Sequence, residues 1–216
     1  MKRIENLYNE LIKIYGDVGK WWPGTPEEIF VTAILTQNTN WKNVEKALKN
    51  IYKLTNPHDI LKDLHKLSKE EIAKLIKPAG FFNIKADRLK NLLNFLAHYN
   101  FEVEKLKKYE TYDLRKELLN IKGIGKETAD SILLYALNKP ILVVDTYTKR
   151  ILERMYGIKE NDYEKVQSIF HESYPRKTKL FQQLHGLIVE HAKAVCRKKP
   201  LCNQCKLSQK CFFKSS

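Results

Sequence analysis

The chain has 216 residues, of which 43% are hydrophobic and 30% charged, an ordinary composition for a globular protein with a real core. This composition excludes wholesale disorder. Purely apolar stretches run only a few residues, so we expect no membrane span, which needs roughly 20. From the charged first residues we expect no secretory signal.

Basic residues outnumber acidic ones. The chain carries 39 Lys and Arg against 25 Asp and Glu, a formal net charge of +14. An excess of this size favours a polyanionic partner, with nucleic acid first and an anionic membrane surface second.

Apolar residues recur at helical spacing along almost the whole chain. Leu7, Leu11 and Tyr15 step by four, and the same period returns at 72–80 and 89–96. Only Ile141–Val144 has the β-branched run of a strand. We therefore predict an all-α protein of about ten helices. Glycine, proline and asparagine mark its loops and turns at 16–26, 56–57, 78–80, 122–126 and 138–140.

Residues 118–129 form a predicted helix, a turn with Gly123 and Gly125, and a second helix. Glycine permits a positive φ and a close approach by a ligand. The turn N–H groups would converge at a helix start, where an anion such as a DNA phosphate is favoured. A plain helical corner is the alternative reading. The candidate DNA-binding residues here are Lys122, Gly123, Gly125, Lys126 and Thr128.

Asp145 lies between a short apolar run and a new helix, 20 residues beyond Gly125. A lone aspartate at this place is most simply a helix N-cap. One helix and one turn separate it from the glycine turn, however. We expect that spacing to return the carboxylate to the side of the bound phosphate.

All four cysteines lie in the last 21 residues, at Cys196, Cys202, Cys205 and Cys211. A structural zinc site usually shows two close pairs, and this segment has one. Four thiolates at mixed spacing suit a cubane iron–sulfur cluster better. Basic residues surround the segment, and Lys193 is a further candidate for phosphate contact.

In this order and spacing, the glycine turn, the Val-Asp-Thr aspartate and the cysteine loop resemble the endonuclease III superfamily of helix-hairpin-helix DNA glycosylases. The resemblance covers about residues 25–211. It implies two helical domains flanking a DNA-binding groove, with a damaged base flipped out of the duplex. Residues 27–136 would form a helical barrel that ends in the hairpin. Residues 1–26 and 137–216 would form a second domain with a 4Fe–4S loop at 196–211.

Further segments look like the 3-methyladenine glycosylase branch of that superfamily. They are Trp21-Trp22-Pro23, residues 34–39, residues 77–83, residues 123–130 and His185-Gly186. Two features depart from that branch. Leu187 stands where the branch carries a lysine, and this chain keeps cluster cysteines that the branch can lack.

The resemblance also implies the mechanism. Strand-cutting members have a lysine two residues after the second hairpin glycine, where this chain has Glu127, which cannot form a Schiff base. We therefore expect a monofunctional glycosylase in which Asp145 stabilises the charge growing on the deoxyribose and orients a water. The products are a free base and an abasic site. The alternatives are a bifunctional endonuclease III-like glycosylase/AP lyase and a non-catalytic DNA-binding module.

Five more residues are candidates for contact with DNA and the flipped base. Trp21, Trp22 and Trp41 could stack on an extruded base, such as an alkylated purine, although core packing is an equally good reading. Uracil or another deaminated base is the other substrate class. Gln37 and Asn38 could fill the gap in the duplex, or could simply cap a helix. We expect a monomer that binds double-stranded DNA containing a damaged base, without a membrane, in a prokaryotic cytoplasm.

Overall fold

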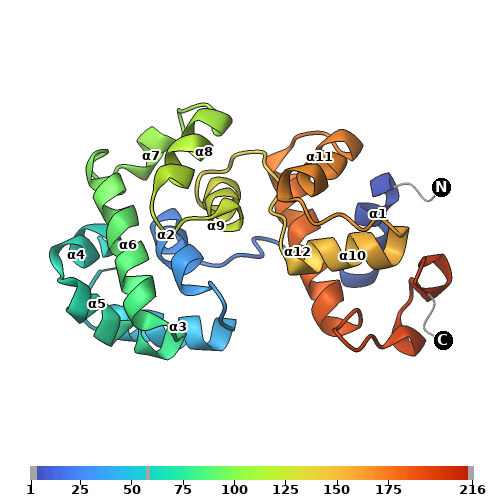
Figure 1. Cartoon of the computed structure of the whole chain (residues 1–216), viewed down its shortest axis with the longest axis horizontal. Coiled ribbons are helices and arrows are strands. Elements are labelled where there is room, and N and C mark those ends of the chain that lie inside the picture. The colour runs from blue at the N-terminus through green and yellow to red at the C-terminus, as the bar shows by residue number, and fades with distance from the viewer. Residues whose placement is uncertain (1–3, 57–58, 214–216) are drawn as a thin grey trace. The chain divides into compact units, whose positions relative to one another are not determined.

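The computed structural model describes residues 4–56 and 59–213, and the regular structure within them is helical throughout. The all-α prediction is therefore confirmed. Ile141–Val144, the one candidate strand, is an irregular segment and not a strand. The chain divides into two compact units, residues 23–139 and residues 1–22 with 140–216 (Figure 1). The sequence analysis placed these boundaries at 26/27 and 136/137.

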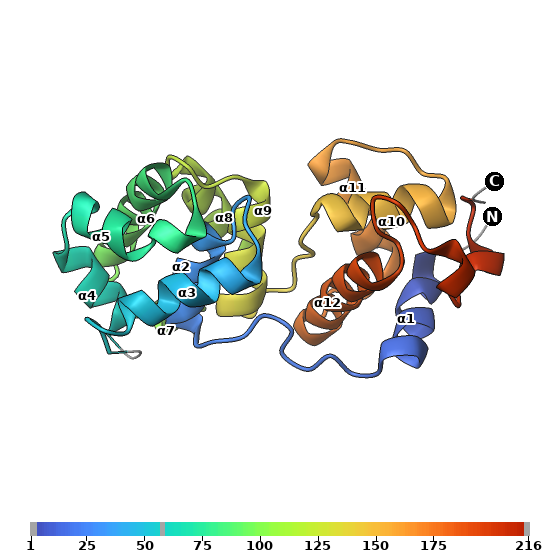
Figure 2. The same cartoon turned by 90° about the horizontal axis from the view of Figure 1, so that it is seen from below.

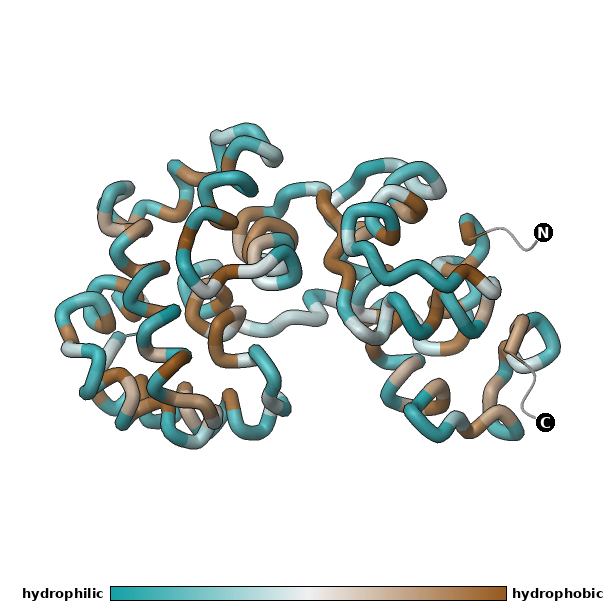
Figure 3. Tube along the Cα trace, viewed as in Figure 1, coloured by the Kyte–Doolittle hydropathy of each residue, from teal (hydrophilic) through white to brown (hydrophobic). Residues whose placement is uncertain are grey.

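The unit formed by residues 23–139 is built around α2. This helix begins at a capping box in which Thr25 and Glu28 bond each other's backbone N–H groups, and Pro26 occupies its first turn. Residues 29–35 of α2 are all buried, and all of them except Thr32 are hydrophobic (Figure 3). It packs against α4, α6, α9 and η3. The elements of this unit are α2 (Pro26–Leu35), α3 (Trp41–Ile51), α4 (Ile60–Lys66), α5 (Lys69–Leu75), η2 (Lys77–Ala79), α6 (Phe82–Ala97), α7 (Val103–Leu106), α8 (Thr111–Asn120), α9 (Lys126–Ser131) and the π-helical turn η3 (Ile132–Ala136).

The other unit is organised by α12, which packs against α1 and α10 (Figure 2). Leu7 and Leu11 on α1 and Leu184 and Leu187 on α12 are fully buried. Leu187, the residue that replaces the branch lysine, is thus a core residue here. The elements of this unit are η1 (Ile4–Asn6), α1 (Leu7–Tyr15), α10 (Thr146–Tyr156), α11 (Tyr163–Ser173), α12 (Thr178–Ala194), η4 (Cys202–Gln204) and η5 (Ser208–Lys210).

The sequence-predicted loop at 16–26 and the turn at 122–126 coincide with the gaps between helices. The helix end expected at residues 56–57 lies partly outside the described residues. No helix in the described part of the chain is long and apolar enough to cross a membrane.

Candidate functional site

The turn between α8 and α9 has one backbone conformation that only glycine supports. Gly123 has φ +98°, and a Cβ there would lie 2.2 Å from the Arg88 Cγ atom. Asn91 Nδ2 donates to the Lys122 carbonyl at 3.0 Å and anchors the turn from α6. Gly125 occupies the N-cap position of α9 and contributes no side-chain cap. The glycine turn therefore leads directly into a helix start, where backbone N–H groups favour an anion.

Gln37 ties the end of α2 to this hairpin. Its Nε2 donates to the Gly123 carbonyl at 3.3 Å and to the Thr128 hydroxyl at 3.0 Å. Arg88 Nη1 donates to the Gln37 Oε1 at 2.5 Å. Thr128 is only 8% exposed. Both predicted DNA-binding residues thus help to fix the hairpin, and their contact with DNA stays a prediction.

The other predicted DNA-binding positions of this unit are open to solvent. Lys122, Gly125 and Lys126 are exposed on the hairpin. Asn38 is also exposed and has a left-handed backbone, with φ +53°. Unlike Thr128, these residues are exposed, so a DNA partner can reach them.

Phe81 is a candidate that the sequence analysis named only within a resemblance segment. It is 66% exposed and has φ +47°, an uncommon conformation for a bulky residue. Strained backbone at an exposed aromatic is typical of a contact site. Beneath this turn, the buried Lys85 Nζ donates to the Ala79 carbonyl at 2.8 Å and to the Leu35 carbonyl at 2.9 Å. Burial lowers the pKa of Lys85 to about 8, and Arg88 adds to the effect.

Asp145 is the N-cap of α10, as the sequence indicated. Its Oδ1 accepts hydrogen bonds from the Thr148 N–H at 2.7 Å and the Thr148 hydroxyl at 2.9 Å. Its Oδ2 lies 3.5 Å from His185 Nε2 on α12, and the Asp145 side chain is 12% exposed. Burial acts to raise the pKa of Asp145, but His185 and Thr148 outweigh burial and hold that pKa below its usual range. Asp145 is therefore a shielded but ionised carboxylate.

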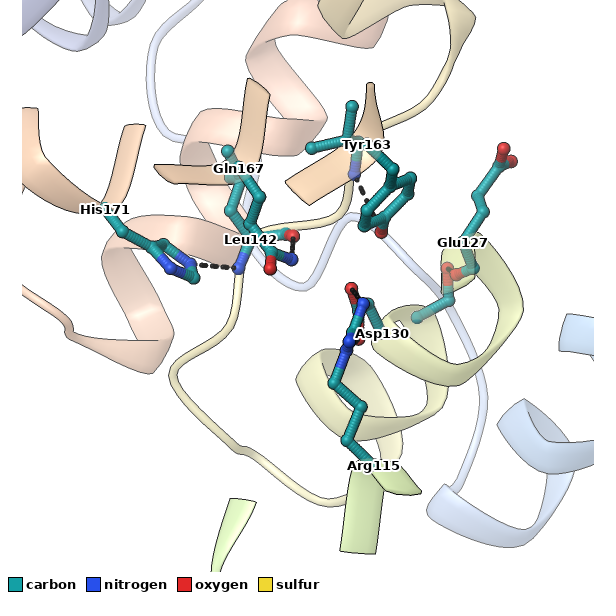
Figure 4. A network of polar contacts seen from close by, with 9 residues as sticks. Arg115, Glu127, Asp130, Leu142, Tyr163, Gln167 and His171 are labelled. Carbon is teal, nitrogen blue, oxygen red and sulfur yellow. Dashed lines mark hydrogen bonds and ion pairs between the residues drawn. The ribbon is translucent and has the colours of Figure 1, made fainter. Parts of the chain in front are cut away.

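Side chains of α11 hold the extended segment that leads to Asp145. His171 Nε2 accepts from the Leu142 N–H at 3.1 Å, and Gln167 Nε2 donates to the Leu142 carbonyl at 2.6 Å (Figure 4). The Tyr163 hydroxyl accepts from the Val144 N–H at 3.2 Å. These contacts replace strand pairing, so the backbone before Asp145 is fixed without a sheet.

The three predicted pocket tryptophans do not form one cluster within either unit. The rings of Trp21 and Trp22 meet edge-on, with their centroids 6.3 Å apart, and Trp22 is 8% exposed. Trp41 begins α3 in the other unit. Trp21 Nε1 donates to Glu190 Oε1 at 2.9 Å, and Lys193 Nζ lies 5.5 Å from the Trp21 ring centroid. A shared base pocket stays a prediction.

All four cysteines line one pocket at the end of α12, together with Arg154 and His191. Burial is the main cause of the raised pKa of the Cys205 and Cys211 thiols, and the charges of the neighbouring cysteines raise it further.

Arg154 fixes the loop that carries the first cysteine. Its Nη1 donates to the Arg197 carbonyl at 2.6 Å and lies 3.5 Å from Cys196 Sγ, and its Nη2 donates to the Lys198 carbonyl at 3.1 Å. Within residues 4–56 and 59–213, no three His, Cys, Asp or Glu side chains converge on a position for one metal ion.

The hairpin and the capped aspartate both lie within the segment that matches a known family. The model of the HhH-GPD superfamily base excision DNA repair protein matches residues 31–176. A Methanocaldococcus jannaschii protein, provisionally named as a DNA repair glycosylase, is 44% identical over 98% of this chain and 96% of its own length. Endonuclease III of Thermotoga maritima is 29% identical over 97% of this chain and 92% of its own length.

A solved structure gives the same result. The Helicobacter pylori 3-methyladenine DNA glycosylase, bound to 1,N6-ethenoadenine, aligns with a TM-score of 0.79 and 32% identity, over 89% of this chain and 98% of its own. The expected enzyme class, a hydrolase of N-glycosyl bonds, is confirmed by these matches. The chain belongs to the HhH-GPD superfamily and is a DNA glycosylase of base excision repair.

Proposed function

We propose that this enzyme is a monofunctional DNA N-glycosylase that removes an alkylated purine, such as 3-methyladenine, from double-stranded DNA. The observation that carries the proposal is the ionised, shielded carboxylate of Asp145, held at the start of α10 by Thr148 and faced by His185. A carboxylate with this environment suits a reaction that develops positive charge on a sugar.

Asp145 would act on both halves of the hydrolysis. The C1′–N bond breaks and its electron pair leaves with the base, so the deoxyribose gains positive charge that the carboxylate stabilises. A water oxygen then bonds to C1′, and its proton passes to the Asp145 carboxylate and on to solvent. An alkylated purine carries a positive charge before cleavage and leaves as a neutral base, which lowers the demand for an acid. This fits a site with one carboxylate.

Glu127 supports a reaction without strand cleavage. It occupies the exposed first turn of α9, at the position where a strand-cutting member needs an amine. Lys126 is adjacent but lies about 100° further around the helix. Lys85 has a pKa lowered to about 8, but its Nζ is bound to two carbonyls and the residue is 1% exposed.

The substrate class rests on similarity. The H. pylori structure aligned above is named for 3-methyladenine and holds 1,N6-ethenoadenine, and it is 32% identical to this chain. An Aeropyrum pernix relative at 27% identity is named as a thymine-DNA glycosylase, which keeps uracil and other deaminated or mismatched pyrimidines as the second candidate class.

The cysteine pocket would hold a 4Fe–4S cluster through Cys196, Cys202, Cys205 and Cys211. The donor set fits this group, because four thiols line one pocket and a cubane takes one thiolate for each iron. When bound, the cluster would link the four cysteines and stabilise the loop that carries them. The residues 197–199 beside it are all basic, so the loop would be available to a phosphate backbone.

One assay tests the substrate and the mechanism together. The enzyme is incubated with duplexes that carry 3-methyladenine, 1,N6-ethenoadenine, uracil or thymine opposite guanine, and the released base and the strand are analysed separately. We expect an alkylated adenine to be released and the strand to stay intact until alkali is added. Asp145→Asn should retain DNA binding and lose excision by orders of magnitude. Release of pyrimidines alone would overturn the substrate, and full activity of Asp145→Asn would overturn the mechanism.

Borohydride trapping separates the monofunctional reading from the lyase alternative. We expect little or no covalent complex, because Glu127 stands at the position where a strand-cutting member needs the amine that forms a Schiff base. Efficient trapping that disappears in Lys126→Ala would show that this lysine forms the Schiff base.

Metal analysis of the purified chain should give about four irons, whereas stoichiometric zinc without iron would overturn the proposed cluster.

A further inference from the structure

His185 is a buried imidazole that faces the carboxylate. It lies within α12, its side chain is 3% exposed, and its Nε2 points to Asp145 Oδ2 at 3.5 Å. The other oxygen of Asp145, Oδ1, is already occupied by both donors of Thr148. The contact of Oδ2 with His185 therefore fixes how the remaining lone pairs of the carboxylate are directed.

Trp21 holds this imidazole in place. The two rings meet edge-on, with centroids 5.3 Å apart and an interplanar angle of 86°. The Trp21 ring is itself anchored at its far side, where Nε1 donates to Glu190 Oε1 at 2.9 Å. The charged groups Glu190 and Lys193 contact Trp21, and Asp145 is the charged group that faces His185 from α10.

Gly186 explains why Trp21 can come so close. Glycine inside a helix costs about 1 kcal/mol relative to alanine, so its presence in the middle of α12 requires a reason. A Cβ at Gly186 would lie 2.7 Å from Trp21 Cγ and 2.8 Å from Trp21 Cβ. The absent side chain thus provides the space in which the indole packs beside His185.

We propose that His185 is a positioning residue for base excision. It donates its Nε2–H to Asp145 Oδ2 and directs that carboxylate at the sugar. Trp21 and Gly186 hold the imidazole in place. This inference rests on the proposed role of Asp145. The separation of 3.5 Å is longer than a charge-assisted hydrogen bond, and catalytic contacts of this kind commonly shorten when substrate binds.

The test uses single-turnover excision by the full, iron-loaded enzyme. His185→Leu should lower the rate of the chemical step roughly 10- to 100-fold with little change in duplex affinity, since the lost contact is one hydrogen bond to a charged group. His185→Gln should recover most of the rate, because its amide can donate to the same oxygen. In an Asp145→Asn background, adding His185→Leu should cause no further loss. Gly186→Ala, which pushes on Trp21, should lower the rate in the same direction.

His171→Leu is the matched control. It removes an imidazole that bonds Leu142 in the segment before Asp145, but His171 does not bond the carboxylate. It should lower stability, and it should lower the excision rate much less than His185→Leu does, because the contact to the carboxylate is kept. An equal loss of rate in His171→Leu and His185→Leu would overturn the proposal, because general loosening of this segment would explain both.

A carboxyl NMR titration gives a readout that a purely structural role would not move. In His185→Leu the pKa of Asp145 should rise above its wild-type value. Burial raises this pKa, and the contact with His185 that lowers it is lost. Wild-type excision by His185→Leu, with Asp145→Asn inactive, would overturn this inference alone. Full activity of Asp145→Asn would remove the proposed function and this inference with it. If His185→Leu does not fold, the excision rates of His185→Gln and Gly186→Ala test the proposal instead. An unchanged excision rate in Gly186→Ala would overturn the claim that Trp21 and Gly186 hold His185 in place.

Discussion

The ion pair between Arg115 and Asp130 offers a direct test of what holds the hairpin together. Arg115 Nε bonds Asp130 Oδ1 at 2.6 Å, and Arg115 Nη2 bonds Asp130 Oδ2 at 3.1 Å, which joins α8 to α9 across the glycine turn (Figure 4). The Asp130 side chain is 0% exposed and that of Arg115 is 11% exposed. Arg115→Met would leave a fully buried carboxylate without its guanidinium.

Breaking one side of a buried pair costs about 3–5 kcal/mol, which far exceeds the effect of a surface ion pair. For a chain of this size that corresponds to a fall in melting temperature of roughly 6–20 °C. Replacing both partners, in Arg115→Met/Asp130→Leu, should recover most of the loss, because an apolar pair of similar volume is often neutral. Urea unfolding followed by circular dichroism measures both values.

Lys116→Met is the control for this prediction. It lies on the same helix, its side chain is 79% exposed, and its Nζ lies 4.0 Å from the Asp113 Oδ1. We expect a change within about 0.5 kcal/mol. A loss below about 1 kcal/mol in Arg115→Met, or a double variant as unstable as the single one, would refute the reasoning that removing the guanidinium from a buried carboxylate sets the cost.

Three further predictions concern stability and DNA binding. The pKa of Lys85 is about 8 in the folded chain and near 10.4 when unfolded, so the unfolded state binds more protons between these values and stability should rise with pH there, by up to about 3 kcal/mol. Urea unfolding at several pH values should show this rise in the wild type and lose it in Lys85→Met. Phe81→Ala should weaken duplex binding in a fluorescence-anisotropy titration while leaving the melting temperature nearly unchanged, since the ring is 66% exposed; unaltered affinity would remove Phe81 from the interface. Duplex affinity should fall steeply between about 50 and 200 mM salt, and a flat response would contradict phosphate binding by the hairpin and its lysines.

The spacing of apolar residues and the positions of capping residues predict helices and some of their ends. The four-residue step of Leu7 and Leu11 marks a helix whose apolar face is buried, and the sequence position of Asp145 predicts its role as N-cap. An aspartate near a helix start is not always its cap: α8 begins at Thr111, and the Asp113 carboxylate lies in its first turn. Acidic residues suit both positions, because the helix dipole favours them across the whole first turn.

Buried polar residues were harder to foresee, although their positions carried a signal. Lys85 stands four residues before Leu89 and seven before Leu92, on the apolar stripe of α6, and all three are buried. His185 likewise lies on the face of α12 that also buries Ile188 and Val189. A polar residue on such a stripe must find a partner inside the protein. Periodicity shows that the partner is needed, but only the tertiary structure identifies it.

The hairpin shows why a motif alone predicts a site incompletely. Its glycines predict the turn because backbone conformation is a local property of the chain. The side chains that fix the turn come from elsewhere: Gln37 lies 86 residues before Gly123, and Arg88 reaches Gln37 across 51 residues. The same Arg88 also fills the space that any side chain at position 123 would need. The glycine is therefore required twice, once by its own φ and once by a residue of α6, and only the first requirement is visible in the sequence.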